Sequence, residues 1–104
     1  MAMLLIDTSG SEEVTVALQL KGEEHMLRER VGRHKAQEVL PMLDRLLRDH
    51  SLSLKDITEI SVNAGPGSYT GLRVGTSIAN TLGFLLNIPV NGLPVGKFVT
   101  PVYS

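Results

Sequence analysis

The sequence predicts an α/β fold: one mixed sheet of about five strands with two helices, in the order β-β-β-α-β-α-β. Three short apolar or alternating segments come first, and their connections are short enough for hairpins. Two segments with helical periodicity follow, and each leads into a further strand-like stretch. The 104 residues suit one small domain, and 42% apolar with 20% charged residues is an ordinary globular balance.

The first three predicted strands are expected to form an antiparallel meander. Residues 3–7, MLLID, are a short apolar run, and residues 12–22 alternate around β-branched positions. Residues 23–31, EEHMLRERV, are more polar, which places them nearer an edge of the sheet. The short connections TSGSE and KGEE favour hairpins between neighbouring strands.

The later elements alternate between helix and strand. An apolar stripe at helical spacing predicts the first helix and consists of Ala36, Val39, Leu40, Leu43, Leu46 and Leu47. Pro41 lies inside this stretch, so the helix either begins only a few residues earlier or bends there. Residues 57–64 read as a buried strand and residues 72–86 as the second helix. Residues 87–93, NIPVNGL, read as a short further strand.

The composition of the chain argues against several classes of function. A formal net charge of −1 provides no global basic field for nucleic acid, and the absence of cysteine excludes disulfides and thiolate chemistry. His25, His34 and His50 lack the spacing of a zinc site, so no metal is expected. No apolar run is long enough to span a bilayer and the N-terminus is not a secretory signal, so we expect a soluble intracellular protein.

A basic cluster surrounds His34, with Arg28, Arg30, Arg33 and Lys35. It either meets an RNA backbone or an acidic partner, or forms an ordinary solvated edge, and the second interpretation is favoured. Two tyrosines and two phenylalanines do not provide a base-stacking platform. No general base lies near Ser68 or Ser77 in the sequence, so a serine nucleophile has no positive support.

The glycine-rich segment NAGPGSYTGLRVG, residues 63–75, has two interpretations. A strand, a glycine-rich turn and a helix N-terminus in this order suit anion binding by backbone amides, with Gly67 and Ser68 as candidate contacts. However, the segment lacks the lysine of a P-loop, and its third glycine comes one residue too late for a dinucleotide-binding motif. The alternative is a bend that leads into a closely packed helix.

The second helix supports the packing interpretation. Its residues spaced by four along one face are all small: Gly71, Gly75, Ala79 and Gly83. Each glycine costs about 1 kcal/mol against alanine in a helix, so this stripe needs a packing reason. A stripe of small residues lets another backbone approach closely, either the sheet beneath it or another helix.

A second candidate site follows the first strand, at Asp7, Thr8 and Ser9. An aspartate beside two hydroxyls at a strand end can orient a metal-bound phosphate or a water. More often such a group caps its own turn, and we favour that interpretation here.

Several segments in order resemble the bacterial TsaB family, also called YeaZ: LLIDTS, RHKAQEVLPMLDRLL, SLKDITEISVNAGPGSYTGLRVG and NIPVNGL. Residues 65–75 match its specific segment G-P-G-S-[FY]-T-G-[LV]-R-[IV]-G throughout. The similarity covers roughly residues 3–93. The resemblance implies an actin-like, sugar-kinase-like (ASKHA) fold, whose lobes are of the ribonuclease-H type.

The resemblance also implies a function. TsaB proteins assist the synthesis of N6-threonylcarbamoyladenosine (t6A37) in ANN-decoding tRNAs, together with the catalytic subunit TsaD and the ATPase TsaE. TsaB is regarded as a non-catalytic paralogue, which implies no cofactor of its own, only indirect contact with tRNA, and a cytoplasmic location away from membranes.

Family members dimerise, with TsaD or with themselves, through two helices that match residues 37–49 and 71–86. This match implies an interface made by Leu40, Leu43, Leu47, Gly71, Gly75, Ala79 and Gly83. The alternative is an ATP-binding ASKHA phosphotransferase or a fragment of a TsaD-like (glycoprotease-like) enzyme. That alternative would use Asp7, Thr8, Ser9, Gly67 and Ser68.

The sequence departs from the family pattern in three places. Family members continue into a second lobe, so residues 1–104 are expected to be a single N-terminal lobe with the second lobe absent. The helix that normally follows the last strand is replaced by GLPVGKFVTPVYS. Residues 34–36 read His-Lys-Ala where the family commonly has His-Ser-Glu, so any role of that serine is lost.

Overall fold

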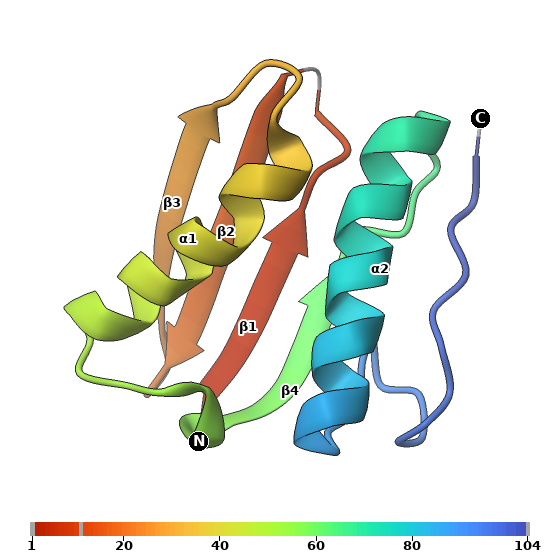
Figure 1. Ribbon diagram of the computed structural model, residues 1–104. Coiled ribbons are helices and arrows are strands. Elements are labelled where there is room, and N and C mark those ends of the chain that lie inside the picture. The colour runs from red at the N-terminus through yellow and green to blue at the C-terminus, as the bar shows by residue number, and fades with distance from the viewer. Residues whose placement is uncertain (1, 11, 104) are drawn as a thin grey trace.

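The computed structural model describes residues 2–10 and 12–103, and it has a four-stranded mixed sheet with two α-helices (Figure 1). The elements in chain order are β1 (Ala2–Asp7), β2 (Glu13–Leu20), β3 (Glu23–Arg30), α1 (Lys35–Asp49), a 3-10 turn (Leu54–Asp56), β4 (Ile57–Val62) and α2 (Tyr69–Leu86). The strand order is β3-β2-β1-β4, with β1 antiparallel to β2 and parallel to β4. The predicted α/β class and meander are confirmed.

The β2–β3 hairpin is closed by a two-residue turn. Lys21 and Gly22 both have positive φ, 54° and 80°, which matches the twist of the strands that they connect. The hairpin pairs in regular register from Glu13 with Arg30 to Leu20 with Glu23. As the polar sequence of β3 predicts, this strand lies at an edge of the sheet.

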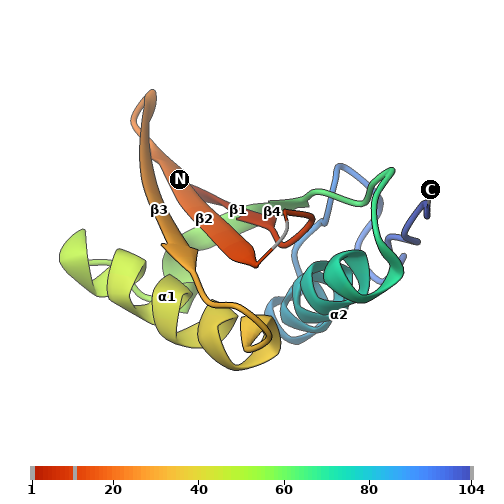
Figure 2. The ribbon, with the colours of Figure 1, turned by 90° about the horizontal axis from the view of Figure 1, so that it is seen from above.

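Both helices cover the same face of the sheet, and no described element covers the other face (Figure 2). The apolar stripe of α1 is buried, with Val39, Met42, Leu43, Leu46 and Leu47 facing the sheet. Leu4, Val16, Leu18 and Ile60 lie opposite them and are almost fully buried. Pro41 lies on the exposed side of α1, and the helix begins six residues before it, at Lys35.

The predicted fifth strand is reduced to a single bridge between Val90 and Ile60, so the sheet has four strands rather than about five. Asn91 and Gly92 both adopt positive φ and turn the chain away. The side-chain amide of Asn91 then accepts a hydrogen bond from Val62 N–H at 2.7 Å and donates one to Val62 C=O at 3.0 Å. The Asn91 side chain thus takes the hydrogen bonds that a neighbouring strand would make with Val62, so the pairing with β4 ends at Val90.

The C-terminal segment, residues 97–103, runs back along the side of α2 that faces away from α1 (Figure 1). We call this segment the tail. Val99 is buried in this tail and joins the core. Neither helix in the described part of the chain is long and apolar enough to cross a membrane.

Candidate functional site

The parallel strands β1 and β4 end at the same edge of the sheet, and α1 and α2 begin there (Figure 1). This topology brings the predicted residues at the end of β1 beside the glycine-rich segment that follows β4. Asn63 forms one link, since its Nδ2 donates a hydrogen bond to Ser9 Oγ at 3.0 Å. Its Oδ1 accepts one from Gly65 N–H at 3.0 Å.

Asp7 caps its own turn, as the favoured interpretation predicts. Its Oδ1 accepts hydrogen bonds from Ser9 N–H at 2.9 Å and from Ser9 Oγ at 2.6 Å. Partial burial acts to raise the pKa of Asp7, but the hydrogen bonds from Ser9 and Asn63 and the charge of Lys35 outweigh it, so the net pKa is lowered. Asp7 is therefore an ionised and already hydrogen-bonded carboxylate at neutral pH.

Thr8 serves packing, and its side chain is not open to a ligand. It is fully buried, and its Oγ1 donates a hydrogen bond to Gly71 C=O at 2.5 Å and accepts one from Gly75 N–H at 3.0 Å. An α-helix normally pairs these two backbone groups with each other, so the hydroxyl is inserted into the hydrogen-bond ladder of α2. The prediction of Thr8 as a nucleotide contact is therefore wrong.

The small-residue stripe faces the protein's own sheet. A Cβ at Gly71 would lie 2.7 Å from Thr8 O, and one at Gly75 would lie 2.6 Å from Thr8 Oγ1. At Gly83 the nearest atom would be Val90 Cγ2 at 2.4 Å, and Ala79 is fully buried. These four positions are filled from within the chain, so their prediction as subunit-interface residues is corrected: the close partner is the sheet beneath.

The glycine-rich turn contacts the tail through Gly65 and Gly67 and leads into α2 at Ser68. Gly65 has φ +111°, and a Cβ there would lie 2.1 Å from Val102 O, so this glycine permits close approach of the tail. Gly67 forms a bridge with Tyr103. Ser68 is the exposed N-cap of α2, and its side chain makes no capping hydrogen bond. Gly67 and Ser68 stay predictions as phosphate contacts.

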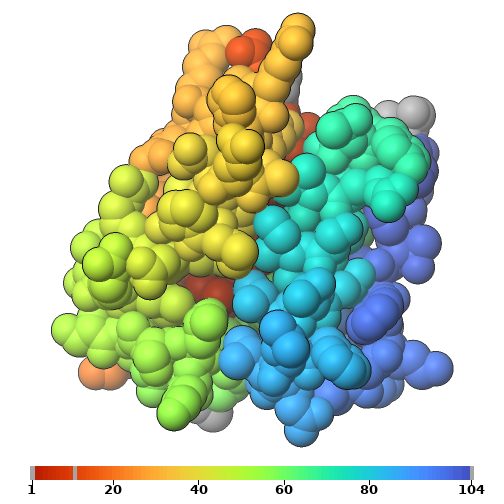
Figure 3. Space-filling model, viewed as in Figure 1, coloured from red at the N-terminus to blue at the C-terminus, as the bar shows by residue number. Residues whose placement is uncertain are grey.

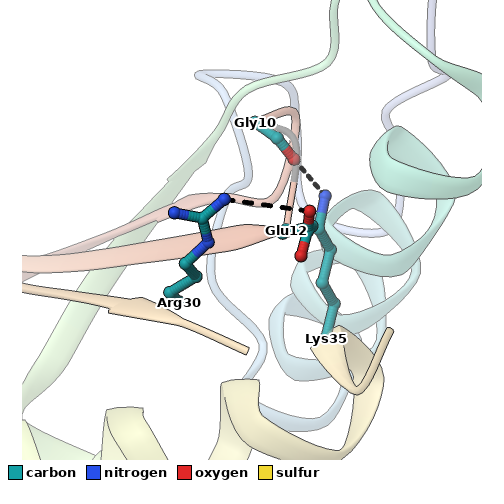
Figure 4. Close-up of polar contacts among 4 residues, drawn as sticks. All are labelled: Gly10, Glu12, Arg30 and Lys35. Carbon is teal, nitrogen blue, oxygen red and sulfur yellow. Dashed lines mark hydrogen bonds and ion pairs between the residues drawn. The ribbon is translucent and has the colours of Figure 1, made fainter. Parts of the chain in front are cut away.

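Lys35 is a site residue that the sequence did not single out on its own. Figure 4 shows this side chain reaching from the start of α1 to the carbonyl oxygen of Gly10, beside the exposed ion pair of Glu12 and Arg30. Lys35 Nζ also donates a hydrogen bond to Thr8 C=O at 2.9 Å. The ammonium thus ties the β1–β2 turn to α1. The sequence does place Lys35 at the start of the predicted first helix, and this position could have indicated a contact with the nearby end of a strand.

The basic cluster does not form one continuous surface. Lys35 turns inward to the β1–β2 turn, whereas Arg28 Nε donates a hydrogen bond to Thr15 Oγ1 at 3.1 Å across the β2–β3 hairpin. Arg33 and His34 are exposed in the β3–α1 connection. This arrangement agrees with the favoured interpretation of a solvated edge.

An apolar groove runs between α1 and α2 on the outer surface of the helices (Figure 3). One hollow of about 280 Å³ is lined by Leu40, Ser77, Ile78, Thr81, Leu82 and Leu85. A second of about 210 Å³ adjoins it and is lined by Leu40, Leu43, Asp44, Leu47, Leu54 and Leu82. We call this groove the α1–α2 seam. Leu40 is 52% exposed and Leu85 70%, while Leu43 and Leu47 form the buried floor.

Several known proteins share the sequence and the fold of this chain. The sequence model of the family described as TsaD: tRNA N6-adenosine threonylcarbamoyltransferase matches residues 26–95. The tRNA threonylcarbamoyladenosine biosynthesis protein TsaB of Haemophilus influenzae is 38% identical over 90 residues, and that of Escherichia coli is 37% identical over 93. YeaZ from Pseudomonas aeruginosa superposes with a TM-score of 0.82 at 33% identity, over 89% of this chain and 43% of that chain. The chain belongs to the TsaB (YeaZ) family.

The family resemblance and the actin-like ASKHA fold class are thereby confirmed. The matches cover 86% of this chain with the H. influenzae TsaB and 89% with the E. coli TsaB. The chain spans about two fifths of these relatives, 38% and 40% of their lengths. In the described part of the chain, no three His, Asp or Glu side chains gather where they could hold a metal ion.

Proposed function

We propose that this chain is a non-catalytic interaction subunit of the TsaB type, acting in the cytoplasm to support a TsaD-like transferase in t6A modification of tRNA. Residues 1–104 would serve as a single TsaB-like N-terminal lobe. The observation that carries the proposal is the α1–α2 seam, where two neighbouring helices present Leu40 and Leu85 to solvent. Membership of the TsaB family supports the pathway.

The seam suits burial against another helical surface. Thr81 Oγ1 already donates a hydrogen bond to Ser77 C=O at 2.8 Å, so covering this hydroxyl would leave no donor unsatisfied. Apart from the side chains of Ser77, Thr81 and Asp44, the last of which pairs with Arg48 at 2.9 Å, the lining is apolar. Full burial of a leucine side chain contributes about 1.5–3 kcal/mol. Two helices from a partner can pack their ridges into such a groove. Burial of Leu40 and Leu85 would then drive association.

The same surface on a second copy would give an isologous homodimer in isolation, in which each seam meets its symmetry mate. In the modification complex a TsaD-like subunit would take the place of that second copy. A TsaE-like ATPase would join the assembly, and tRNA would be contacted only indirectly.

Sedimentation velocity over a range of concentrations tests the seam. We expect Leu85→Glu to weaken self-association at least tenfold, because a charge would be buried in an apolar interface. Met26→Glu is the matched control, since Met26 is 50% exposed on the opposite face of the sheet. A wild-type chain that stays monomeric at high concentration, or equal weakening by both variants, would contradict the proposal.

A second candidate, ATP binding, rests on the ionised Asp7 and the α2 N-terminus at one edge of the sheet. The hydrogen bonds weigh against it, since Asp7 is engaged by Ser9 and Lys35 by backbone carbonyls. No histidine hydrogen-bonds Ser9 or Ser68 in the residues described, so a peptidase-like role has less support still. Titration calorimetry with ATP and magnesium separates the two candidates: Asp7-dependent binding would favour the enzyme.

A further inference from the structure

Asp44 brings a carboxylate to the lining of the α1–α2 seam. The rest of the lining of the two hollows (Figure 3) consists of leucine and isoleucine side chains and of the hydroxyl residues Ser77 and Thr81. Among the residues that the structure describes, no lysine, arginine or histidine lines either hollow. The seam therefore presents a negative charge beside an apolar surface, without a cation in its own lining.

The carboxylate of Asp44 lies at the mouth of the second hollow. Leu40 is four residues before Asp44 and Leu47 is three residues after it, so the three share one face of α1, and all of them line the hollow of about 210 Å³. The Asp44 side chain is 64% exposed, whereas Leu47 is buried. An incoming lysine or arginine can lay its aliphatic stem on the leucines and bring its charged end to the carboxylate.

The present partner of Asp44 is Arg48, one turn further along α1. Arg48 Nη2 lies 2.9 Å from Asp44 Oδ2, and the Arg48 side chain is 74% exposed. Such a solvated pair on one helix contributes little to stability, so Arg48 can move away at small cost. Arg48 is outside the lining of both hollows and pairs with Asp44 from the solvent side. A partner that covers the seam without supplying a cation would bury the carboxylate against apolar side chains, which is unfavourable.

We propose that Asp44 makes the seam selective for a helix that carries a basic residue among apolar ones. The apolar residues would fill the two hollows, and the lysine or arginine would pair with Asp44. A second copy of this chain would bring another Asp44 carboxylate and no cation from the described lining, so Asp44 favours a different protein over self-association. This inference rests on the proposed function, in which the seam is the interface, and adds the charge that the partner must carry there.

Asp44→Asn keeps the shape of the side chain and removes its charge. We expect the Kd for a TsaD protein, measured by titration calorimetry, to rise about tenfold, because the partner's basic residue loses its counter-charge at a covered site. Self-association, measured by sedimentation velocity, should become tighter by about threefold, because two carboxylates no longer enter the interface. A loss of folding would weaken both associations, so the opposite directions of the two changes identify a role of the charge.

Asp49→Asn is the matched control, since Asp49 is also exposed on α1, lies outside both hollows and gives the same change in net charge. It should leave both constants unchanged. An Asp44→Asn chain that binds the TsaD protein as tightly as wild type, or that weakens both associations, would overturn the proposal. Leu85→Glu separates this result from a failure of the proposed function. If Leu85→Glu weakens TsaD binding and Asp44→Asn does not, the seam is the interface and only its charge selectivity is refuted. If neither variant weakens TsaD binding, both are refuted.

Discussion

Thr8 joins the end of β1 to the first turns of α2 through one hydroxyl group. The hydroxyl lies between Gly71 C=O and Gly75 N–H, so a strand residue completes the hydrogen bonding of a helix. Asp7 and Ser9, on either side, form a closed turn of their own. The sequence identified Asp7 as a turn cap, but it could not reveal the role of Thr8. That role depends on a contact with residues more than sixty positions away.

Replacing Thr8 by valine, which keeps the shape and removes the hydroxyl, should lower the free energy of unfolding by about 1–3 kcal/mol. The cost arises because Gly71 C=O and Gly75 N–H lose their buried partner. Urea unfolding followed by circular dichroism measures the loss. Thr8→Ser, which keeps the hydroxyl, is the control, and a valine variant as stable as wild type would refute this account of Thr8.

Asp7 should make stability depend on acid pH. Its pKa is lowered in the folded state, so its contribution is present above the unfolded value of 3.8 and is lost as pH falls through the folded value. Asp7→Asn should therefore reduce the stability difference between pH 7 and the acid range. Paired urea titrations of wild type and Asp7→Asn would test this. Parallel pH profiles for the two chains would contradict the assigned hydrogen bonds.

At the scale of elements, periodicity predicted both helices, the three-strand meander and β4. Periodicity could not predict which part of the protein packs against the small-residue face of α2, because the spacing of residues shows only which of them share a helix face. The structure places Gly71 and Gly75 against Thr8. The fifth strand was overestimated, because the Asn91 side chain ends the pairing that Val90 begins. A side chain that takes over main-chain hydrogen bonds in this way leaves no periodic pattern in the sequence.

The close approach of α2 to β1 predicts coupling between Gly75 and Thr8. Gly75→Ala should destabilise the wild type by about 1–3 kcal/mol, because the new Cβ would lie 2.6 Å from Thr8 Oγ1. In a Thr8→Ala background that clash is gone, and the gain in helix propensity should offset much of the cost. A double-mutant cycle by urea unfolding measures the coupling. Additive effects would argue against direct contact.

For the whole molecule, α1 and α2 both pack on one face of the sheet and leave the α1–α2 seam on their outer side. The predicted interface combined three leucines of α1 with the small-residue face of α2, yet that small-residue face packs against the protein's own sheet. Of the predicted interface residues, Leu40 remains exposed at the seam, with Leu43 and Leu47 beneath it. Leu85, which the predicted interface did not include, is the most exposed leucine lining the seam.

Titration calorimetry between this chain and a TsaD protein tests the central claim most directly. We expect the wild type and Met26→Glu to bind alike. Leu40→Glu and Leu85→Glu should each raise the Kd at least tenfold, which corresponds to about 1.4 kcal/mol. Circular dichroism spectra should match wild type, because both leucines are more than half exposed. Undiminished binding by the two folded seam variants would contradict the claim that the α1–α2 seam is the surface through which this chain acts.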